Sequence, residues 1–194
     1  TDIFFNNMST WNRSFTVGWT GNAAHGGDRD HKRFYSLVTP LILNNASEFG
    51  FRLAVRNVND GVKQQLIKAG AWIEELPPGD MPCFYNSIDL LINVSRSEGI
   101  ASSTVEALAC GVPVVTTPVG YARNMIVPGA GGVIVSRDPE ISEILDAIRQ
   151  IEKLDRARTR RMNSFIARNL FEWNLAVSYT ETAFDTITKG HRGV

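Results

Sequence analysis

Short apolar runs alternate with segments of helical periodicity from residue 14 into the C-terminal third of this chain. Apolar runs that are bounded by Gly, Pro or Asn are typical of strands in a sheet. Strands that alternate with helices form a parallel sheet with helices on both faces. The pattern therefore predicts an α/β fold, a Rossmann-like doubly wound sheet with strands at residues 14–19, 51–55, 71–75, 90–94, 114–117 and 132–135.

Helices are predicted between these strands, where apolar residues gather on one side and capping residues stand at the ends. Asp60, Asp80 and Asp138 are the predicted N-caps, and Pro139 follows Asp138 as the first helical residue. Gly111 is predicted to take the left-handed conformation that ends a helix. The predicted helices cover residues 32–44, 60–69, 81–87, 104–110, a short turn near residue 123, a segment from residue 139 and a last helix at 173–188.

The C-terminal third carries an apolar stripe and a run of arginines, and we expect its helices, at about 139–188, to pack on the sheet. A stripe at helical spacing, which predicts burial, is formed by Ile141, Ile144, Leu145, Ile148, Ile151 and Leu154. We expect a helix face exposed to solvent, formed by Arg156, Arg158, Arg160 and Arg161. A patch that binds phosphate is the alternative interpretation of these arginines.

Composition limits the classes of function. The length of 194 residues fits one domain, residues 1–194. Twenty basic and twenty acidic residues balance, so no excess charge favours nucleic acid or an anionic membrane surface. Cys83 and Cys110 lie in apolar patterns and are predicted to be free, buried thiols of a cytoplasmic protein. The three histidines lack the spacing of metal ligands, and no apolar run reaches the ~20 residues that cross a bilayer.

The stretch at residues 95–120 carries the chemistry that the sequence predicts. A small-residue turn follows a strand and leads into a helix, and in an open α/β sheet such loops bind ligands. The first amides of a helix lack partners within the helix and favour a phosphate. Glu98 and Glu106 stand on either side of these amides, where each carboxylate could accept hydrogen bonds from sugar hydroxyls. Phosphate between two such carboxylates predicts a nucleotide sugar as ligand.

Glu106 also has a purely structural interpretation. The segment Ser103-Thr104-Val105-Glu106 fits a capping box, in which the carboxylate only satisfies the backbone amide of Ser103. Spacing alone leaves both interpretations open.

The pattern S-E-G-x-x-x-x-x-x-E-A-x-A-x-G-x-P-V-V, from Ser97 to Val115, resembles the donor-site signature of retaining glycosyltransferases. These enzymes have the two-Rossmann-domain GT-B fold, and the chain most resembles their glycosyl transferases group 1, or family-four, branch. The resemblance implies one half of a GT-B fold that binds a nucleoside-diphosphate sugar. It also implies retaining sugar transfer without a metal or other cofactor. The nucleotide, the sugar and the acceptor stay open.

The resemblance implies roles for single residues. Glu98 matches the glutamate that touches hydroxyls of the transferred sugar, and Glu106 matches the glutamate on the ribose. Leu76 matches a residue that packs beside the base. The remaining donor-binding residues that we expect are Gly21, Asn22, Gly99, Ile100, Ala101, Ser102 and Ser103.

One departure from the family concerns the cations on the diphosphate. Family members place an Arg just after the first strand and a Lys several residues later, but Trp19 or its neighbours occupy the place of that Arg here. Lys32 is our candidate for the Lys, with Arg29 or Arg33 as substitutes. Such a cation would stabilise charge that develops on the leaving diphosphate. The alternative is that Lys32 is a surface charge at a helix start.

Other classes of protein compete with the transferase. One half of a nucleotide-sugar epimerase would also need a diphosphate loop, but we expect it to lack the glutamate pair. A non-catalytic module that binds nucleotide sugars would have kept the loop and lost the cation. A dinucleotide dehydrogenase is disfavoured, because Gly18-x-x-Gly21 does not match G-x-G-x-x-G.

The ends of the chain resemble the borders of one domain in the family. The chain starts without Met, and Phe171-Glu172-Trp173 resembles the aromatic pattern that opens the family's last helix. We therefore expect a fragment without the N-terminal acceptor domain, which binds the donor but transfers sugar poorly by itself. We also expect an exposed apolar patch that self-association would cover.

Overall fold

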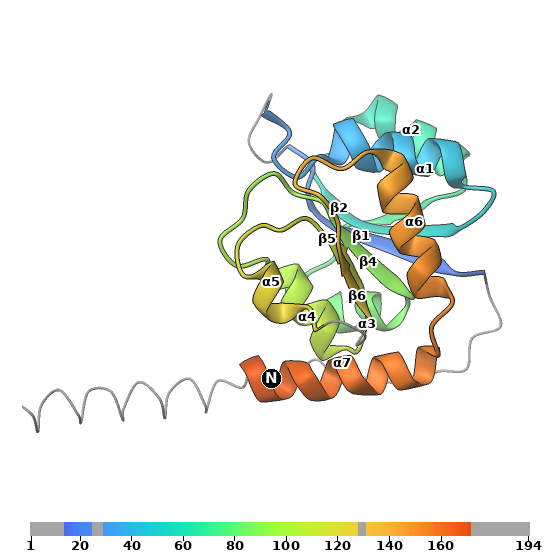
Figure 1. The fold of residues 1–194 in the computed structure, drawn as a ribbon. Helices are drawn as coiled ribbons and strands as arrows, with labels where there is room; N and C mark the ends of the chain where they lie inside the picture. The colour runs from blue at the N-terminus through green and yellow to red at the C-terminus, as the bar shows by residue number, and fades with distance from the viewer. Residues whose placement is uncertain (1–13, 25–28, 128–130, 172–194) are drawn as a thin grey trace, which may run out of the picture.

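Six parallel strands form one sheet in the part of the chain that this computed structural model describes, residues 14–24, 29–127 and 131–171 (Figure 1). The strand order is β3-β2-β1-β4-β5-β6, and each neighbouring pair is parallel. The predicted α/β class and the six predicted strands are confirmed. The strands are β1 (Thr16–Asn22), β2 (Gly50–Arg56), β3 (Trp72–Glu74), β4 (Leu90–Asn93), β5 (Val114–Thr116) and β6 (Gly132–Ile134).

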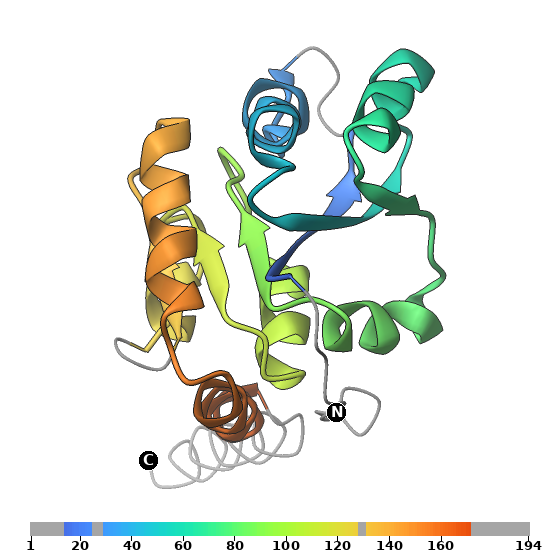
Figure 2. The ribbon, with the colours of Figure 1, turned by 90° about the vertical axis from the view of Figure 1, so that its right-hand side faces the viewer.

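Helices connect the strands and cover both faces of the sheet (Figure 2). Two of the α-helices are preceded by a turn of another helical type. A π-helical turn, Phe34–Val38, leads into α1, and a 3-10 turn, Pro78–Asp80, leads into α3. The α-helices are α1 (Thr39–Asn45), α2 (Asp60–Lys68), α3 (Met81–Asn86), α4 (Ser102–Ala109), α5 (Ala122–Met125), α6 (Ile141–Glu152) and α7 (Arg156–Phe171). The last predicted helix, residues 173–188, lies outside the described residues.

Each face of the sheet has its own core, because successive side chains of a strand point to opposite faces. Leu90 and Ile92 of β4 belong to the core that α1, α2 and α6 cover. Leu91, between them, belongs to the core that α3, α4, α5 and α7 cover. All three side chains are buried, which explains why three successive residues of this strand are apolar. No helix of the described residues is both long enough and apolar enough to span a bilayer.

Strand β1 ends three residues later than predicted, so Gly21 and Asn22 belong to the strand. Its pairing with β2 continues to Asn22, which lies opposite Arg56. Trp19, the last residue of the predicted strand, lies in its middle; the indole is 1% exposed and packs on Phe34 with ring centroids 4.7 Å apart. Burial of a large aromatic surface holds this segment against the sheet. Gly21, which lies beyond the end of the predicted strand, therefore belongs to β1.

Of the predicted N-caps, Asp60 is wrong, and Asp80 holds the predicted position without making a capping bond. Asn59 caps α2, since its side chain accepts hydrogen bonds from the amides of Gly61 and Val62, and Asp60 is the first helical residue. Asp80 is the N-cap residue of α3, as predicted, but its side chain makes no capping hydrogen bond. Its backbone has helical dihedral angles because the 3-10 turn runs directly into the helix.

Helix α6 begins at Ile141, so the prediction of Asp138 as N-cap and Pro139 as first helical residue is wrong. Glu140 holds the N-cap position, and Asp138 forms an ion pair elsewhere, with Arg33. The predicted stripe is confirmed inside the helix, where Ile144, Ile148 and Ile151 are buried. Leu154 lies beyond the helix end and is 39% exposed.

Helix α7 packs on α4, and this contact buries part of the predicted arginine face. Arg160 is 5% exposed and donates to the carbonyl of Ile88, so the solvated position predicted for it is wrong. The backbone of α7 comes so close that a Cβ on Gly111 would lie 2.5 Å from the Arg160 carbonyl oxygen. Gly111 has φ +80°, which confirms the predicted left-handed end of α4.

The other arginines of this run differ in exposure. Arg156 forms an ion pair with the buried carboxylate of Asp89. Arg158 and Arg161 are exposed, as predicted.

The two cysteines are free, as predicted, but only one is buried. Cys110 is buried at the end of α4, and burial raises the pKa of its thiol to about 12. Cys83 is exposed on α3, which corrects the prediction of a buried thiol.

Candidate functional site

The candidate site lies where the strand order reverses. Strand β1 is paired with β2 on one side and β4 on the other. The chain continues from β1 to α1, over one face of the sheet, and from β4 to α4, over the other face (Figures 1 and 2). Two connections that leave neighbouring strands in opposite directions open a crevice at the carboxyl edge of the sheet.

A cleft of about 260 Å³ lies at this edge. It brings together residues from the ends of β1 and β2, from the segment around α3 and from the first turns of α4. Six of the predicted site residues line it: Gly21, Lys32, Leu76, Ser102, Ser103 and Glu106. Six further lining residues were not predicted: Thr20, Ala54, Arg56, Pro78, Met81 and Tyr85.

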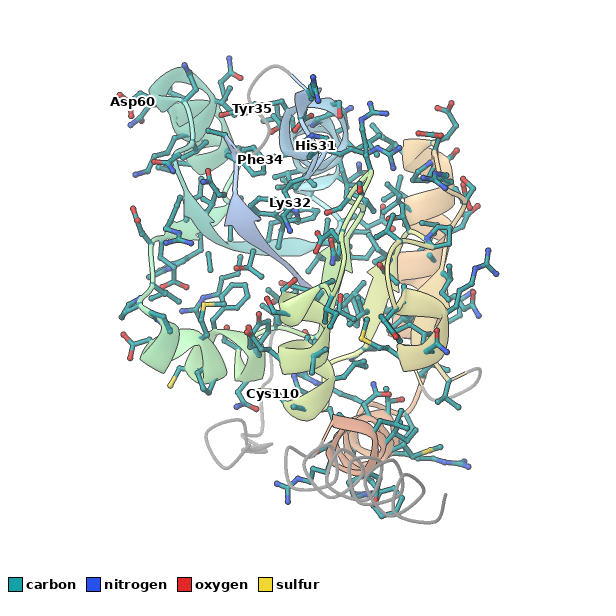
Figure 3. The ribbon with its side chains drawn as sticks, turned by 90° about the vertical axis from the view of Figure 1, so that its left-hand side faces the viewer. His31, Lys32, Phe34, Tyr35, Asp60 and Cys110 are labelled. Atoms are coloured by element: carbon teal, nitrogen blue, oxygen red, sulfur yellow. The ribbon has the colours of Figure 1, made fainter. Side chains whose placement is uncertain are left out.

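Lys32 and Glu98, the two predicted catalytic residues, are in direct contact. Lys32 Nζ donates a hydrogen bond of 2.5 Å to Glu98 Oε1, although the residues stand 66 positions apart. Their side chains are 21% and 10% exposed, so the pair is partly shielded from water. Lys32 precedes the helix start and lies near the strand ends (Figure 3). The carbonyl of His31 accepts a hydrogen bond of 2.8 Å from the Arg96 amide, which fastens the two loops to each other.

A buried polar network holds the Glu98 loop from behind. The Ser95 hydroxyl, 1% exposed, lies 2.5 Å from Glu98 Oε1 and 2.9 Å from Asn93 Oδ1. A hydroxyl carries one proton, and the carboxylate is the stronger acceptor of the two. Asn93 Nδ2 donates to Thr104 Oγ1 at 3.1 Å, and Thr117 Oγ1 donates to the Ser95 carbonyl at 2.6 Å. The carboxylate is thereby tied, through Ser95, to the chain after β4 and to the end of β5.

The first turn of α4 borders the cleft. Ala101 holds the N-cap position, and its alanine side chain offers no capping group. Ser102 and Ser103, the first two helical residues, line the cleft. Because the first amides of a helix have no partner within the helix, this end of α4 can donate to an anion.

Glu106 is not a capping residue, so the capping-box alternative is wrong. Ser103 lies inside α4 instead of capping it. The Glu106 carboxylate accepts a hydrogen bond of 2.7 Å from the hydroxyl of Tyr85 on α3. Burial, with Glu106 as the next cause, raises the pKa of Tyr85 far above its usual value, so the hydroxyl stays a donor. Tyr85 and Glu106 both line the cleft, and their hydrogen bond fixes the Glu106 carboxylate in the cleft wall.

The predicted turn before α4 forms the rim of the site and does not line the cleft. Ile100 is 66% exposed, whereas Ala101 is buried. Behind the turn, Gly120 has φ +51°, and a Cβ there would lie 1.9 Å from the carbonyl oxygen of Gly99. Only glycine allows this close approach, which sets the position of the rim.

Asn22 stands at the end of β1, and its side chain serves local structure. Its Oδ1 accepts hydrogen bonds from the Ala24 amide at 3.0 Å and from Asn57 Nδ2 at 3.2 Å.

Arg33, a predicted substitute for Lys32, points away from the cleft. Its guanidinium donates to the carbonyls of Val94 at 3.2 Å and Arg137 at 2.8 Å, and it pairs with Asp138. The side chain is 3% exposed, and burial, followed by the charge of Arg96, lowers its pKa. Arg33 therefore braces the loops behind Lys32. Arg29, the other substitute, is exposed and does not line the cleft.

Carboxylates near the cleft do not gather as metal ligands in the described part of the chain. The sequence contains an Asp-x-Asp triplet, Asp28-Arg29-Asp30, of which residue 28 lies outside the described residues. The Asp30 carboxylate accepts hydrogen bonds from the amides of Tyr35 and Ser36, and so caps the first helical turn. No group of three His, Cys, Asp or Glu residues that could hold a metal occurs among the described residues.

Comparison with protein families gives one match that covers more than half of the chain. The model of the family described as "Glycosyl transferases group 1" matches residues 62–167. The matched range contains Glu98, Glu106 and Tyr85.

Curated relatives match over parts of the chain. A lipopolysaccharide core biosynthesis mannosyltransferase, LpsB, from Rhizobium meliloti is 33% identical over 91 residues, which are 44% of this chain and 26% of that protein. A D-inositol 3-phosphate glycosyltransferase from Catenulispora acidiphila is 29% identical over 119 residues, which are 60% of this chain and 28% of that protein. The matches thus span about a quarter of the length of these relatives.

Solved structures share the fold at low identity. A sucrose-phosphate synthase from Thermosynechococcus elongatus has a TM-score of 0.74 at 15% identity, over 97% of this chain and 51% of that chain. The C-terminal domain of a glycosyl transferase group 1 family protein, LpcC, from Francisella tularensis has a TM-score of 0.63 at 16% identity. That match covers 88% of this chain and 96% of the domain. The fold therefore resembles the C-terminal half of GT-B glycosyltransferases.

Proposed function

This chain belongs to the glycosyl transferases group 1 family, and from that premise we propose that it binds the nucleoside-diphosphate sugar donor of a retaining sugar transfer. The observation that carries the proposal is the cleft itself. It joins a cation, Lys32, to the first amides and the Glu106 carboxylate of α4, two segments that lie far apart in the sequence. Cation and amides suit a diphosphate, and the carboxylate suits hydroxyl groups.

Each part of the cleft suits one part of the donor. The diphosphate lies against the amides of Ser102 and Ser103 and near Lys32. The base lies toward Leu76 and Pro78, at the end of the cleft formed by the segment around α3. Glu106, held by Tyr85, takes the ribose hydroxyls with the oxygen that does not receive the tyrosine proton.

Glu98 and Lys32 divide the chemistry of the transfer. When the sugar leaves, negative charge develops on the diphosphate, and the amides of α4 and Lys32 stabilise it. Glu98 Oε1 is engaged by Lys32 and Ser95, which leaves Oε2 to accept hydrogen bonds from the transferred sugar. The cleft supplies the positive charge from its own residues. The non-catalytic alternative assumes that the cation was lost, so the presence of Lys32 in the cleft supports the transferase over that alternative.

We expect UDP, GDP or ADP to raise the thermal unfolding midpoint of this chain. A ligand that binds only the folded state stabilises it by about 2.7 kcal/mol at 100 times its dissociation constant. Differential scanning fluorimetry with the three nucleotides measures this, with inorganic phosphate as the control for ionic effects. No shift with any nucleotide at millimolar concentration would contradict the proposed function.

We expect Glu106→Gln to weaken nucleotide binding by about tenfold or more, because a hydrogen bond to a charged group contributes about 1.5–3 kcal/mol. The variant keeps an oxygen for the Tyr85 hydroxyl, so its stability should change less than its affinity. Isothermal titration calorimetry with the nucleotide and its 2′-deoxy analogue checks the contact. The unchanged protein should prefer the ribonucleotide, and the variant should lose that preference. Equal affinity of the unchanged protein for both compounds would refute a ribose contact.

A further inference from the structure

The charges of the cleft balance only because of Arg56, to which sequence reasoning assigned no role. The charged residues that line the cleft are Lys32, Arg56 and Glu106, and Glu98 is bound to Lys32. With Arg56 these four side chains sum to zero. Without it they sum to one negative charge, which would repel the two or more negative charges of a diphosphate in a partly shielded site.

The register of β2 directs Arg56 into the cleft. Along a strand every second side chain shares a face, and Ala54, two residues earlier, also lines the cleft. Val55, between them, is buried in the core on the other face. The carbonyl of Arg56 accepts a hydrogen bond of 2.9 Å from the Ala23 amide, which fixes the strand end beside the end of β1. Position 56 therefore stands opposite Asn22 of β1, at the carboxyl edge of the sheet.

The Arg56 guanidinium has no hydrogen-bond or ion-pair partner among the described residues, and the residue is exposed. Arg52, on the same face of the same strand, differs in this respect. Its Nε donates to Glu74 at 2.7 Å, and its guanidinium lies 5.8 Å from the centre of the Trp72 ring. One arginine of β2 thus serves the fold, and the other is available to a ligand.

We propose that Arg56 is a second cation for the diphosphate of the donor, supplied from β2. The inference rests on the proposed function and adds a residue to it. A guanidinium offers two parallel N–H groups to a phosphate, whereas the Lys32 ammonium is already engaged by Glu98. With Arg56 bound to the diphosphate, the phosphate oxygens need not displace Glu98 from Lys32, and Glu98 stays in place for the sugar.

The test compares Arg56→Gln and Arg56→Lys with the unchanged chain by isothermal titration calorimetry. The ligands are a nucleoside diphosphate that binds the unchanged chain, its monophosphate and its nucleoside. We expect Arg56→Gln to weaken the diphosphate about tenfold, since a charge-assisted bidentate contact is lost. The nucleoside should bind both proteins equally, and Arg56→Lys should recover part of the loss. The affinity of Arg56→Gln should also depend less on salt concentration.

Arg158→Gln is the matched control, because it removes the same charge from an exposed position on α7 that does not line the cleft. It should leave the affinity unchanged. Equal binding of the diphosphate by Arg56→Gln and the unchanged chain would overturn the inference and leave the proposed function standing. An equal loss for nucleoside and diphosphate would also overturn it, since Arg56 would then contact the base. Failure of the unchanged chain to bind any nucleotide would contradict the proposed function together with the inference.

Discussion

Gly120→Ala is expected to destabilise the protein by about 2–4 kcal/mol and to weaken nucleotide binding by about tenfold or more. The glycine has φ +51°, a left-handed conformation that costs alanine about 1–2 kcal/mol. The new Cβ would also lie 1.9 Å from the Gly99 carbonyl oxygen and 2.8 Å from that of Glu98. Both contacts are with backbone, so no change of rotamer relieves them. The Glu98 turn has to move, and the contact with Lys32 moves with it.

Urea unfolding measures the loss of stability, and calorimetry of the variant under conditions where it is folded measures the loss of affinity. Gly79→Ala is the control, because a Cβ at that position meets no atom within 4 Å. It should leave both quantities nearly unchanged. A Gly120→Ala protein with the stability and affinity of the unchanged chain would show that the turn before α4 does not depend on the loop behind it.

The sheet could be predicted from the sequence because its signal is local and repeated. The strands contain short apolar runs. Three successive apolar residues in β4 predict burial on both faces, and the structure confirms it. The ends of elements were less predictable, because single hydrogen bonds decide them. Asn59 and Asp60 are both good capping residues, and the one whose side chain reaches the amides of residues 61 and 62 is the cap. Asp138 was predicted as a cap, but it pairs with Arg33, which lies 105 positions earlier, so the local sequence could not indicate this contact.

The site was partly predictable for the same reason. The glutamates and the helix amides lie within one continuous stretch, so the sequence could single them out, although their spacing alone left the role of Glu106 open. Tyr85 and Arg56 come from other segments, and each looks ordinary in its own sequence context. Tyr85 belongs to an apolar helix face, and nothing local shows that its hydroxyl meets Glu106, 21 residues later. Such contacts depend on how α3 and α4 pack, which no local pattern encodes.

Arg33→Met is expected to lower the free energy of unfolding by about 2–4 kcal/mol, since a hydrogen bond from a charged group contributes about 1.5–3 kcal/mol. Methionine keeps the buried apolar stem and relieves the cost of burying a charge, which limits the loss. The carbonyl of Val94 at the end of β4 is buried, and without Arg33 it loses its donor. Arg33 also joins the loop of Lys32 to the chain before α6, through the Arg137 carbonyl and Asp138. Lys32 should therefore be held less firmly, and nucleotide affinity should fall as well.

Urea unfolding of Arg33→Met, Arg33→Lys and the unchanged chain measures this contribution. Arg33→Lys keeps the charge but offers no planar fork, so it should fall between the other two. Arg149→Met is the control, since Arg149 also pairs with a carboxylate, Glu48, at 2.9 Å, but at an exposed position on α6. Exposed pairs contribute little, so this variant should unfold almost like the unchanged chain. If Arg33→Met and Arg149→Met unfold at the same urea concentration, the buried guanidinium does not brace the loops, and Lys32 is held by Glu98 and by the His31–Arg96 backbone bond.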